Sequence, residues 1–254
     1  MLKTMNPVRP VRLLPQVGII SLAVLAYFLV RGATDSAFGA ALRNAHRVID
    51  FERALHLYHE PYLQETLARS AHVRGFFNGI YIYGHWPVIA VTMLWLAWRH
   101  REQFLRLRDG MLLSGLVGMV IYATYPVVPP RLLDGLGLTD TVTQRSEAYR
   151  VLQPPAFVNQ YAAMPSLHAG WDLLVGIAIV AATTSTLLRV VGCLMPVLMA
   201  LSTVATANHY VIDVVAGIAL VLLADQVALL LARRRRAAAA DPTSAPEVLE
   251  REPT

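Results

Sequence analysis

Two segments of the chain carry the side chains best suited to chemistry. His168 ends a Met-Pro-Ser-Leu-His segment, and His209 begins a His-Tyr-Val-Ile-Asp segment that ends at Asp213. Each histidine lies at the start of a long apolar run. Ionisable side chains in or beside membrane spans cost free energy, so their presence indicates function. Two imidazoles, one with a carboxylate a helical turn away, suit a reaction that needs a nucleophile and a proton donor.

The spacing of these residues predicts how they interact. His209 and Asp213 are four residues apart and therefore lie on one face of a helix. Asp213 can accept a hydrogen bond from one ring nitrogen, which fixes the tautomer and raises the basicity of the other. A structural link between helices is the alternative role for Asp213. Asp172 has the same spacing from His168, and we expect it either to orient that ring or to contact a neighbouring helix.

A proline-rich segment before the first histidine supplies a candidate anion ligand. Residues 125–131 read Tyr-Pro-Val-Val-Pro-Pro-Arg. The prolines stiffen the backbone before Arg131, so fixing the position of Arg131 costs little conformational entropy. A guanidinium suits bidentate binding of phosphate. Ser166 offers a hydroxyl at the start of the next helix, where the helix dipole stabilises an anion. Capping of that helix is an equally good role for Ser166.

These parts together predict a phosphoryl-transfer site that uses no metal ion and no other cofactor. His209 attacks phosphorus, and His168 protonates the leaving oxygen. Arg131 and the helix start at Ser166 hold the phosphate oxygens.

The composition is that of a membrane protein. Of 254 residues, 56% are hydrophobic and only 15% are charged, whereas a soluble domain has about 25% charged residues. The net charge is +5, but the basic residues gather at the ends of apolar runs, which indicates membrane orientation and not nucleic-acid binding. The single cysteine, Cys193, excludes a disulfide within the chain.

We therefore expect an all-α polytopic membrane protein with six transmembrane helices. Residues 1–236 form one transmembrane catalytic domain, and residues 237–254 form a disordered cytoplasmic tail. Between the first two runs, Phe38, Leu42, Ala45 and Ile49 recur at spacings of four and three. This pattern predicts an amphipathic helix on the outer membrane surface, either structural or covering a lipid entrance. The six predicted spans are residues 13–30, 76–98, 111–125, 167–183, 190–206 and 210–231.

Arginines at the ends of the apolar runs predict the orientation. They are concentrated between the second and third runs and at Arg233–Arg236, after the sixth. Because such residues favour the cytoplasmic side, we expect both termini in the cytoplasm and both histidine motifs on the outer face of the plasma membrane. A cleaved signal peptide is the alternative for the first run, although Arg31 favours an uncleaved anchor. The outward placement of the motifs is the same in either case.

The motifs resemble those of the type 2 phosphatidic acid phosphatase superfamily, a resemblance that covers residues 84–225. That family shares a helical membrane core and a phosphohistidine mechanism. Its three motifs are a basic one ending in Arg-Pro, then Pro-Ser-Gly-His, then Ser-Arg followed six residues on by His and four later by Asp. The similar residues are Arg131 in the first motif, Pro165, Ser166 and His168 in the second, and His209 and Asp213 in the third.

Three positions depart from the family pattern. Leu167 replaces the glycine, Thr124 lies near the position of the first motif's lysine, and Thr203 occupies that of the third motif's arginine. Two phosphate-binding cations are therefore missing or supplied from elsewhere. The Met-Pro-Ser-Leu-His segment and the Pro-Pro-Arg loop resemble the branch that contains fungal inositol phosphorylceramide synthases. This implies an inositolphosphotransferase-like enzyme that acts on a phosphodiester, with a lipid phosphatase as the alternative within the family.

Other function classes fit the sequence less well. Membrane lipids and a lipid phosphate or phospholipid substrate are the expected partners. A non-catalytic lipid transporter or binding protein would not need the intact His, His and Asp set. A bis-histidine cytochrome would use His85, His168 and His209, but the last two are flanked by aspartates. An intramembrane protease built on Ser166 lacks a Gly-x-Ser-Gly setting.

Two further polar residues lie inside apolar runs. His85 is expected in the protein core or in the outer aromatic belt, with contact to a lipid head group as the alternative. Asp225 is expected to pair with arginines on the cytoplasmic side.

Overall fold

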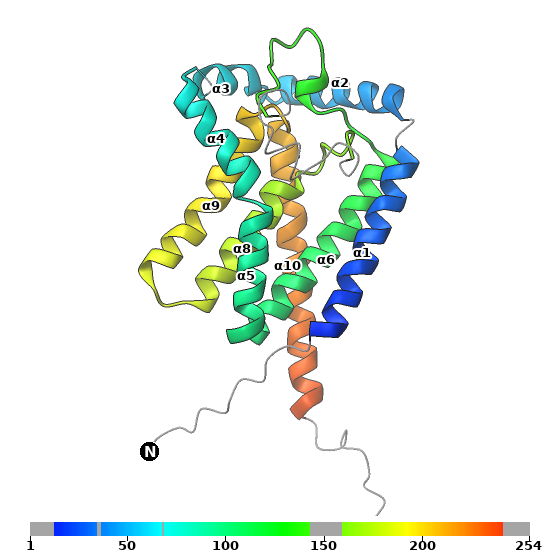
Figure 1. Cartoon of the computed structure of the whole chain (residues 1–254). Coiled ribbons are helices and arrows are strands. Elements are labelled where there is room, and N and C mark those ends of the chain that lie inside the picture. The colour runs from blue at the N-terminus through cyan, green and yellow to red at the C-terminus, as the bar shows by residue number, and fades with distance from the viewer. Residues whose placement is uncertain (1–12, 35–36, 68, 143–158, 241–254) are drawn as a thin grey trace, which may run out of the picture.

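The helices of the bundle run side by side along one axis. The computed structural model describes residues 13–34, 37–67, 69–142 and 159–240, and in these ranges the regular structure is helical, which confirms the all-α class. The first residues of α1 and the last of α10 lie at the same end of the bundle (Figure 1). The long helices are α1 (Leu13–Thr34), α6 (Arg101–Thr124), α8 (Leu167–Ala182), α9 (Thr186–Ala205) and α10 (Val211–Ala240). Helix α10 thus continues into the predicted tail, of which residues 241–254 lie outside the described ranges.

The second predicted span is a bent pair of helices. Helix α4 (Ala71–Tyr83) and helix α5 (Trp86–Arg99) meet at an angle of 44°. Pro87, in the first turn of α5, has no N–H to donate, and in a continuous helix its ring would clash with the carbonyl of the residue four positions earlier. The break places His85 between the two helices.

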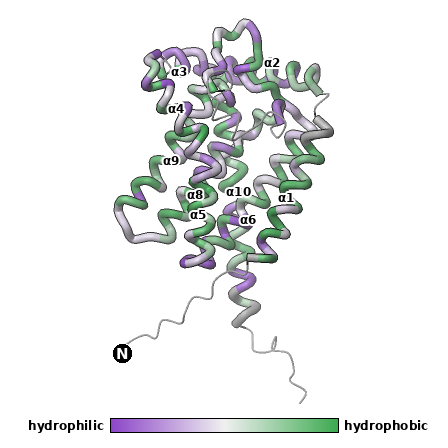
Figure 2. Tube along the Cα trace, viewed as in Figure 1, coloured by the Kyte–Doolittle hydropathy of each residue, from purple (hydrophilic) through white to green (hydrophobic). Residues whose placement is uncertain are grey.

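The described helices support membrane insertion without establishing six spans. Helices α9 and α10 are each long and apolar enough to cross a membrane, and the bent α4–α5 pair supplies a third span if it is counted as one. The apolar part of α1 (Leu14–Val30) and helix α8 are shorter, and the first turns of α6 carry charged residues. Figure 2 shows apolar residues along the bundle and hydrophilic residues gathered around α2 and α3. The number six stays a prediction.

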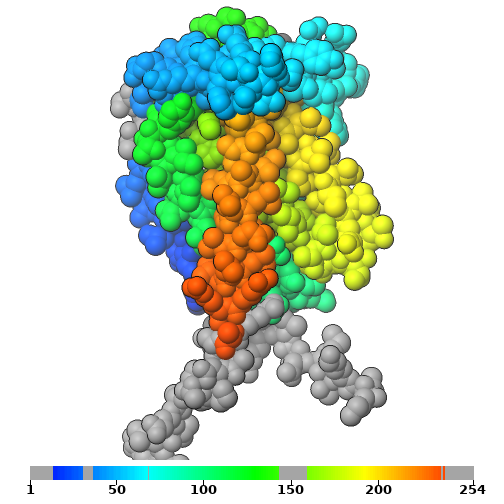
Figure 3. Space-filling view, turned by 180° about the vertical axis from the view of Figure 1, so that it is seen from behind, coloured from blue at the N-terminus to red at the C-terminus, as the bar shows by residue number. Residues whose placement is uncertain are grey.

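Two helices cover one end of the bundle. Helix α2 (Phe38–Ala54) and helix α3 (Glu60–Leu67) lie across this end, over the first turns of α10 (Figures 1 and 3). The predicted amphipathic helix is therefore present, but its buried stripe is Ala41, Ala45, Val48 and Ile49, which packs against Val127, Val128 and Tyr210. Phe38, expected on that stripe, is 50% exposed because it lies in the first turn of the helix.

Buried carboxylates attach this cover to α10. Glu52 Oε1 accepts a hydrogen bond from the backbone N–H of Ile212 at 2.7 Å, and Glu60 Oε1 accepts one from Val211 N–H at 2.8 Å. They satisfy N–H groups that the first turn of a helix leaves without a partner. Neither Oε2 has a hydrogen-bond partner in the described part of the chain. Burial, and then the neighbouring Glu60 carboxyl, raises the pKa of Glu52 to about 9, so Glu52 holds a proton at neutral pH.

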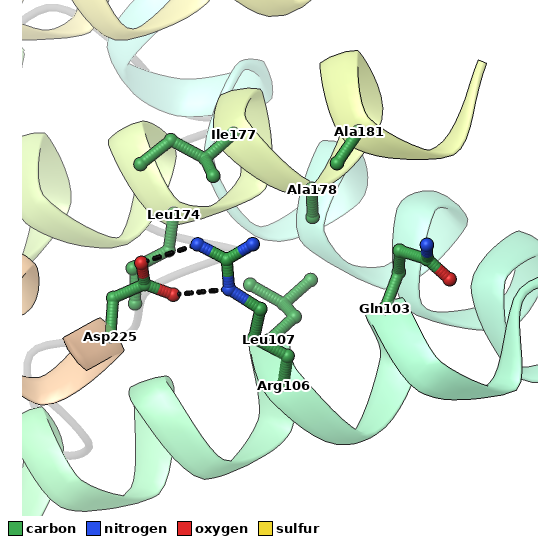
Figure 4. Close-up of a pocket in the computed structure, with 8 residues that line it drawn as sticks. All are labelled: Gln103, Arg106, Leu107, Leu174, Ile177, Ala178, Ala181 and Asp225. Carbon is green, nitrogen blue, oxygen red and sulfur yellow. Dashed lines mark hydrogen bonds and ion pairs between the residues drawn. The ribbon is translucent and has the colours of Figure 1, made fainter. Parts of the chain in front are cut away.

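At the opposite end of the bundle, ion pairs join α6 to α10. Arg106 donates two hydrogen bonds to Asp225, from Nε at 2.7 Å and from Nη2 at 2.6 Å (Figure 4). The expected pairing of Asp225 with an arginine is thus confirmed. The shallow pocket beside this pair contains none of the histidine-motif residues. It is lined by Gln103, Arg106, Leu107, Leu174, Ile177, Ala178, Ala181 and Asp225.

Helices α8 and α10 cross closely because glycines occupy the contact. A Cβ at Gly217 would overlap the carbonyl oxygen of Ser166, and one at Gly170 would lie 2.9 Å from the carbonyl oxygen of Gly217. The backbone N–H of Ser166 donates to the carbonyl of Asp213 at 2.9 Å. The first turns of the two helices are therefore in backbone contact.

Gly217→Ala is expected to destabilise the protein by about 1–3 kcal/mol, because the new methyl group forces the two backbones apart. Thermal unfolding in detergent measures this effect. Gly79→Ala is the matched control, since a Cβ at this helical glycine meets nothing within 4 Å. Equal melting temperatures for the two variants would contradict the close crossing.

The Glu52 carboxyl is expected to make stability depend on pH. Between its ordinary pKa of 4.5 and its folded pKa of about 9, the folded state holds a proton that the unfolded state has released. The free energy of unfolding should therefore fall as pH rises through this range, by at most about 1.4 kcal/mol per pH unit for one proton. Melting temperatures from pH 5 to pH 9 test this, and Glu52→Gln should flatten the curve. Glu65→Gln, at an exposed position, should not, and parallel curves for wild type and Glu52→Gln would refute the bound proton on Glu52.

Candidate active site

The two motif histidines lie beside one another at the end of the bundle that α2 and α3 cover. His168 is in the first turn of α8, and His209 precedes the first turn of α10. Their ring centroids are 5.7 Å apart. The two rings thus fall within reach of one phosphorus atom, as the sequence predicts.

The backbone holds the His209 ring more closely than the aspartate does. Nδ1 of His209 lies 2.7 Å from the carbonyl oxygen of Ala163 and 3.5 Å from Oδ2 of Asp213. A carbonyl only accepts, so Nδ1 carries the proton and Nε2 presents its lone pair. The predicted pairing with Asp213 is therefore present as the longer contact, and the short hydrogen bond of Nδ1 goes to Ala163. Asp213 Oδ2 instead accepts from Tyr210 N–H at 2.9 Å, and its charge lies beside the ring.

His168 lies between other aromatic rings. Its ring stacks on Tyr81, with centroids 4.9 Å apart and planes 25° apart, and contacts His85 at 4.4 Å. Its Nε2 is buried and has no hydrogen-bond partner. A ring held in this way has a nitrogen available for a reacting group.

Asp172 does not orient His168 directly, contrary to one of its two predicted roles. Its Oδ1 lies 2.8 Å from Nδ1 of His85, in a pair whose side chains are each 2% exposed. His85 therefore has the expected core position, and Asp172 makes the alternative helix-to-helix contact. No local spacing signals this pair, because its members come from different helices.

Arg131 lies in a short 3-10 turn, η1 (Pro130–Leu132), and its backbone N–H donates to the carbonyl of Ala207 at 2.8 Å. This bond joins the proline-rich loop to the segment just before His209. The Arg131 side chain is 10% exposed, and its Nε lies 3.6 Å from Oδ2 of Asp140 without a hydrogen bond. No pattern in the sequence indicated Asp140 as a neighbour of Arg131.

Tyrosines fix the loops around the histidines. The Tyr122 hydroxyl donates to the carbonyl of Pro165 at 2.7 Å, and the Tyr210 hydroxyl donates to the carbonyl of Val128 at 3.0 Å. Val127 and Ala162 form an isolated parallel bridge that brings the proline-rich loop against the segment before α8. The three motif segments therefore form one connected unit. Sequence patterns gave no reason to select these tyrosines.

Ser166 caps a helix, whereas Thr124 and Thr203 donate to carbonyls of their own helices. The Ser166 hydroxyl is buried and accepts from Ala169 N–H at 3.4 Å, which is the capping role. Thr124 bonds to the carbonyl of Val120 near the end of α6. The buried Thr203 bonds to the carbonyl of Ala200. Neither threonine replaces a cation, and Arg145 and Arg150 lie outside the described residues.

Unsatisfied polar atoms gather around this site. Native proteins leave few buried polar atoms without a partner, and each requires an explanation. Among the residues that the structure describes, all such side-chain atoms lie in the motif residues, in the carboxyl pair above α10 and in Asp172. They are Oε2 of Glu52 and Glu60, Nε of Arg131, Nε2 of His168, Oδ2 of Asp172 and Oδ1 of Asp213.

Comparison with known families agrees with this geometry. The model of the PAP2 superfamily matches residues 46–227, a range that includes every motif residue and extends from α2 into α10. No curated protein and no solved structure matches the chain. Because the match covers most of the chain, the protein belongs to the PAP2 superfamily, the type 2 phosphatidic acid phosphatases.

Proposed function

We propose that the protein is an integral-membrane enzyme that transfers a phosphoryl group from a lipid phosphate or phosphodiester through a phosphohistidine at His209. The observation that carries this proposal is the 5.7 Å separation of the His168 and His209 rings, with the reactive nitrogen of each free. Membership of the PAP2 superfamily supports a reaction of the lipid phosphatase or phosphotransferase type.

His209 is the nucleophile in this proposal. Its Nδ1–H is held by Ala163, so Nε2 attacks phosphorus while the bond to the leaving oxygen breaks. The ring becomes positively charged as it attacks, and the buried Asp213 carboxylate beside it stabilises that charge.

His168 is the proton donor and later the proton acceptor. It gives a proton to the leaving oxygen in the first step, and it removes one from water or a lipid hydroxyl in the second. That acceptor attacks the phosphohistidine and regenerates Nε2 of His209. Arg131 and the N-terminal turn of α8 hold the phosphate oxygens.

The site faces the outer side of the plasma membrane in this proposal. The start of α1 and the end of α10 lie at the other end of the bundle (Figure 1), where Arg106, Arg108 and Arg233–Arg236 follow or precede apolar segments. Arginines in such positions favour the cytoplasm, so both termini lie there and α2 covers the extracytoplasmic end.

A phosphodiester is the favoured substrate class. Of the family's three motif cations this chain keeps Arg131, and threonines that bond within their own helices occupy or adjoin the other two positions. A diester carries less negative charge than a monoester and needs fewer cations. We therefore infer an inositolphosphotransferase-like reaction in which a lipid hydroxyl is the acceptor. Lipid phosphatase activity is the second candidate, because the superfamily generally comprises phosphatases.

Removal of each histidine should have a different effect. His209→Ala is expected to abolish turnover of every substrate because the nucleophile is lost. His168→Ala should lower turnover by about 10²–10⁴-fold for alkyl leaving groups and much less for aryl leaving groups, which depart without a proton. Steady-state rates of detergent-purified protein test this, with the exposed His46→Ala as control. Equal losses of both substrates in both variants would refute the separate roles.

The acceptor can be identified directly. Purified protein is incubated with head-group-labelled phosphatidylinositol or with labelled phosphatidic acid, each with and without a lipid alcohol. The favoured reading predicts a new labelled phospholipid that forms from phosphatidylinositol only when the alcohol is present. Release of inorganic phosphate from phosphatidic acid, without head-group transfer, would establish the phosphatase in its place.

A further inference from the structure

His85 and Asp172 form a second histidine–aspartate pair beside the candidate active site. The family motifs assign no role to either residue. His85 occupies the break between α4 and α5, and Asp172 lies on α8 one turn after His168. Their side chains meet at 2.8 Å between Nδ1 and Oδ1, buried from solvent. Asp172 Oδ2 has no donor.

The His85 ring is held in a fixed orientation. Trp171 lies parallel to it, with centroids 6.2 Å apart and planes 8° apart, and Trp86 contacts it edge-on at 5.0 Å. Trp171 is itself fixed by the bond from its Nε1–H to the Ser114 hydroxyl at 3.1 Å. His85 is therefore a rigid surface against which the ring of His168 rests at 4.4 Å.

The charges around His168 show what this pair contributes. A positive charge on His85 at 4.4 Å, on His209 at 5.7 Å or on Arg131 in η1 would oppose a positive charge on His168. Asp213 on α10 lies beside His209, and the Tyr81 hydroxyphenyl ring on α4 stacks on the other side. Asp172 supplies a carboxylate on the side of His85. A proton donor flanked by cations needs a nearby negative charge to hold its proton.

We propose that His85 and Asp172 are positioning residues for His168. The His85 ring holds the His168 ring against Tyr81, and the Asp172 carboxylate, acting across His85, favours the protonated form of His168 that the leaving group requires. No proton passes through the pair. The inference rests on the proposed function and deepens it, because it makes protonation of a poor leaving group depend on residues outside the family motifs.

Asp172→Asn tests this, because it keeps the size of the side chain and removes its charge. Rates are measured on two phosphodiesters with the same phosphoryl group, one with an alkyl and one with a p-nitrophenyl leaving group. We expect turnover of the alkyl ester to fall by about 10–100-fold, part of the range for general acid catalysis, and that of the aryl ester by less than about threefold. The alkaline limb of the alkyl-ester pH profile should also move to lower pH.

His85→Asn is the second variant, and it keeps the protein testable if Asp172→Asn does not fold. The asparagine amide can donate to Asp172 but presents no ring to His168, so the same selective loss is expected. Asp225→Asn is the matched control: it neutralises another buried carboxylate, paired with Arg106 at the opposite end of the bundle. It should leave the ratio of the two rates at the wild-type value.

The outcomes separate this inference from the proposed function. An equal loss of both esters with an unmoved pH profile would show that the pair only packs, and would overturn the inference alone. Wild-type protein that turns over neither ester, or His209→Ala protein that retains turnover, would overturn the proposed function itself.

Discussion

The backbone contact between the first turns of α8 and α10 determines the rest of the site. Ser166 N–H donates to the carbonyl of Asp213, and Gly217 leaves room for the Ser166 carbonyl. His168 follows Ser166 by two residues, and His209 precedes Asp213 by four residues. The contact therefore sets the separation of the two rings. A larger side chain at Gly217 would change the separation of the two rings without altering either histidine. The spacing of the two imidazoles therefore depends on a residue that has no side chain.

The end of the bundle that holds the histidines also holds an unusual number of buried acids. Burial of a carboxylate is costly unless hydrogen bonds or a proton compensate it. Glu52 and Glu60 accept from backbone N–H groups of α10 and Glu52 holds a proton, whereas Asp213 accepts from Tyr210 and Asp172 from His85. These bonds connect the cover helices, the histidine segments and the α4–α5 break. The desolvation cost is thus offset by a network that also fixes the positions of His209 and His168.

Residue spacing predicted the positions of helices and motif residues along the chain. It did not predict contacts between residues that are far apart in the sequence. The helix start before His168, the position of His209 ahead of α10 and the helix at residues 38–54 all follow from short-range patterns. The partner of Asp172 could not follow, because His85 lies on another helix 87 positions away. Ala163 holds His209 through a backbone carbonyl, which any residue type supplies and no motif reveals. Pro87 is in the sequence, but the apolar run around it is continuous. Hydropathy therefore predicted one span and not the bend at this proline.

The balance of charge around the histidines bears on the substrate. Arg131 is the motif cation that this chain retains, and Asp140 lies 3.6 Å from its Nε and offsets part of its charge. Asp213 adds negative charge beside His209, and Asp172 adds negative charge beside His85. In a poorly solvated site these interactions are strong, because the effective dielectric constant is well below that of water. Under the proposed function, a doubly charged monoester would meet little positive charge among the residues that the structure describes. A singly charged diester needs less, which supports the proposal of head-group transfer.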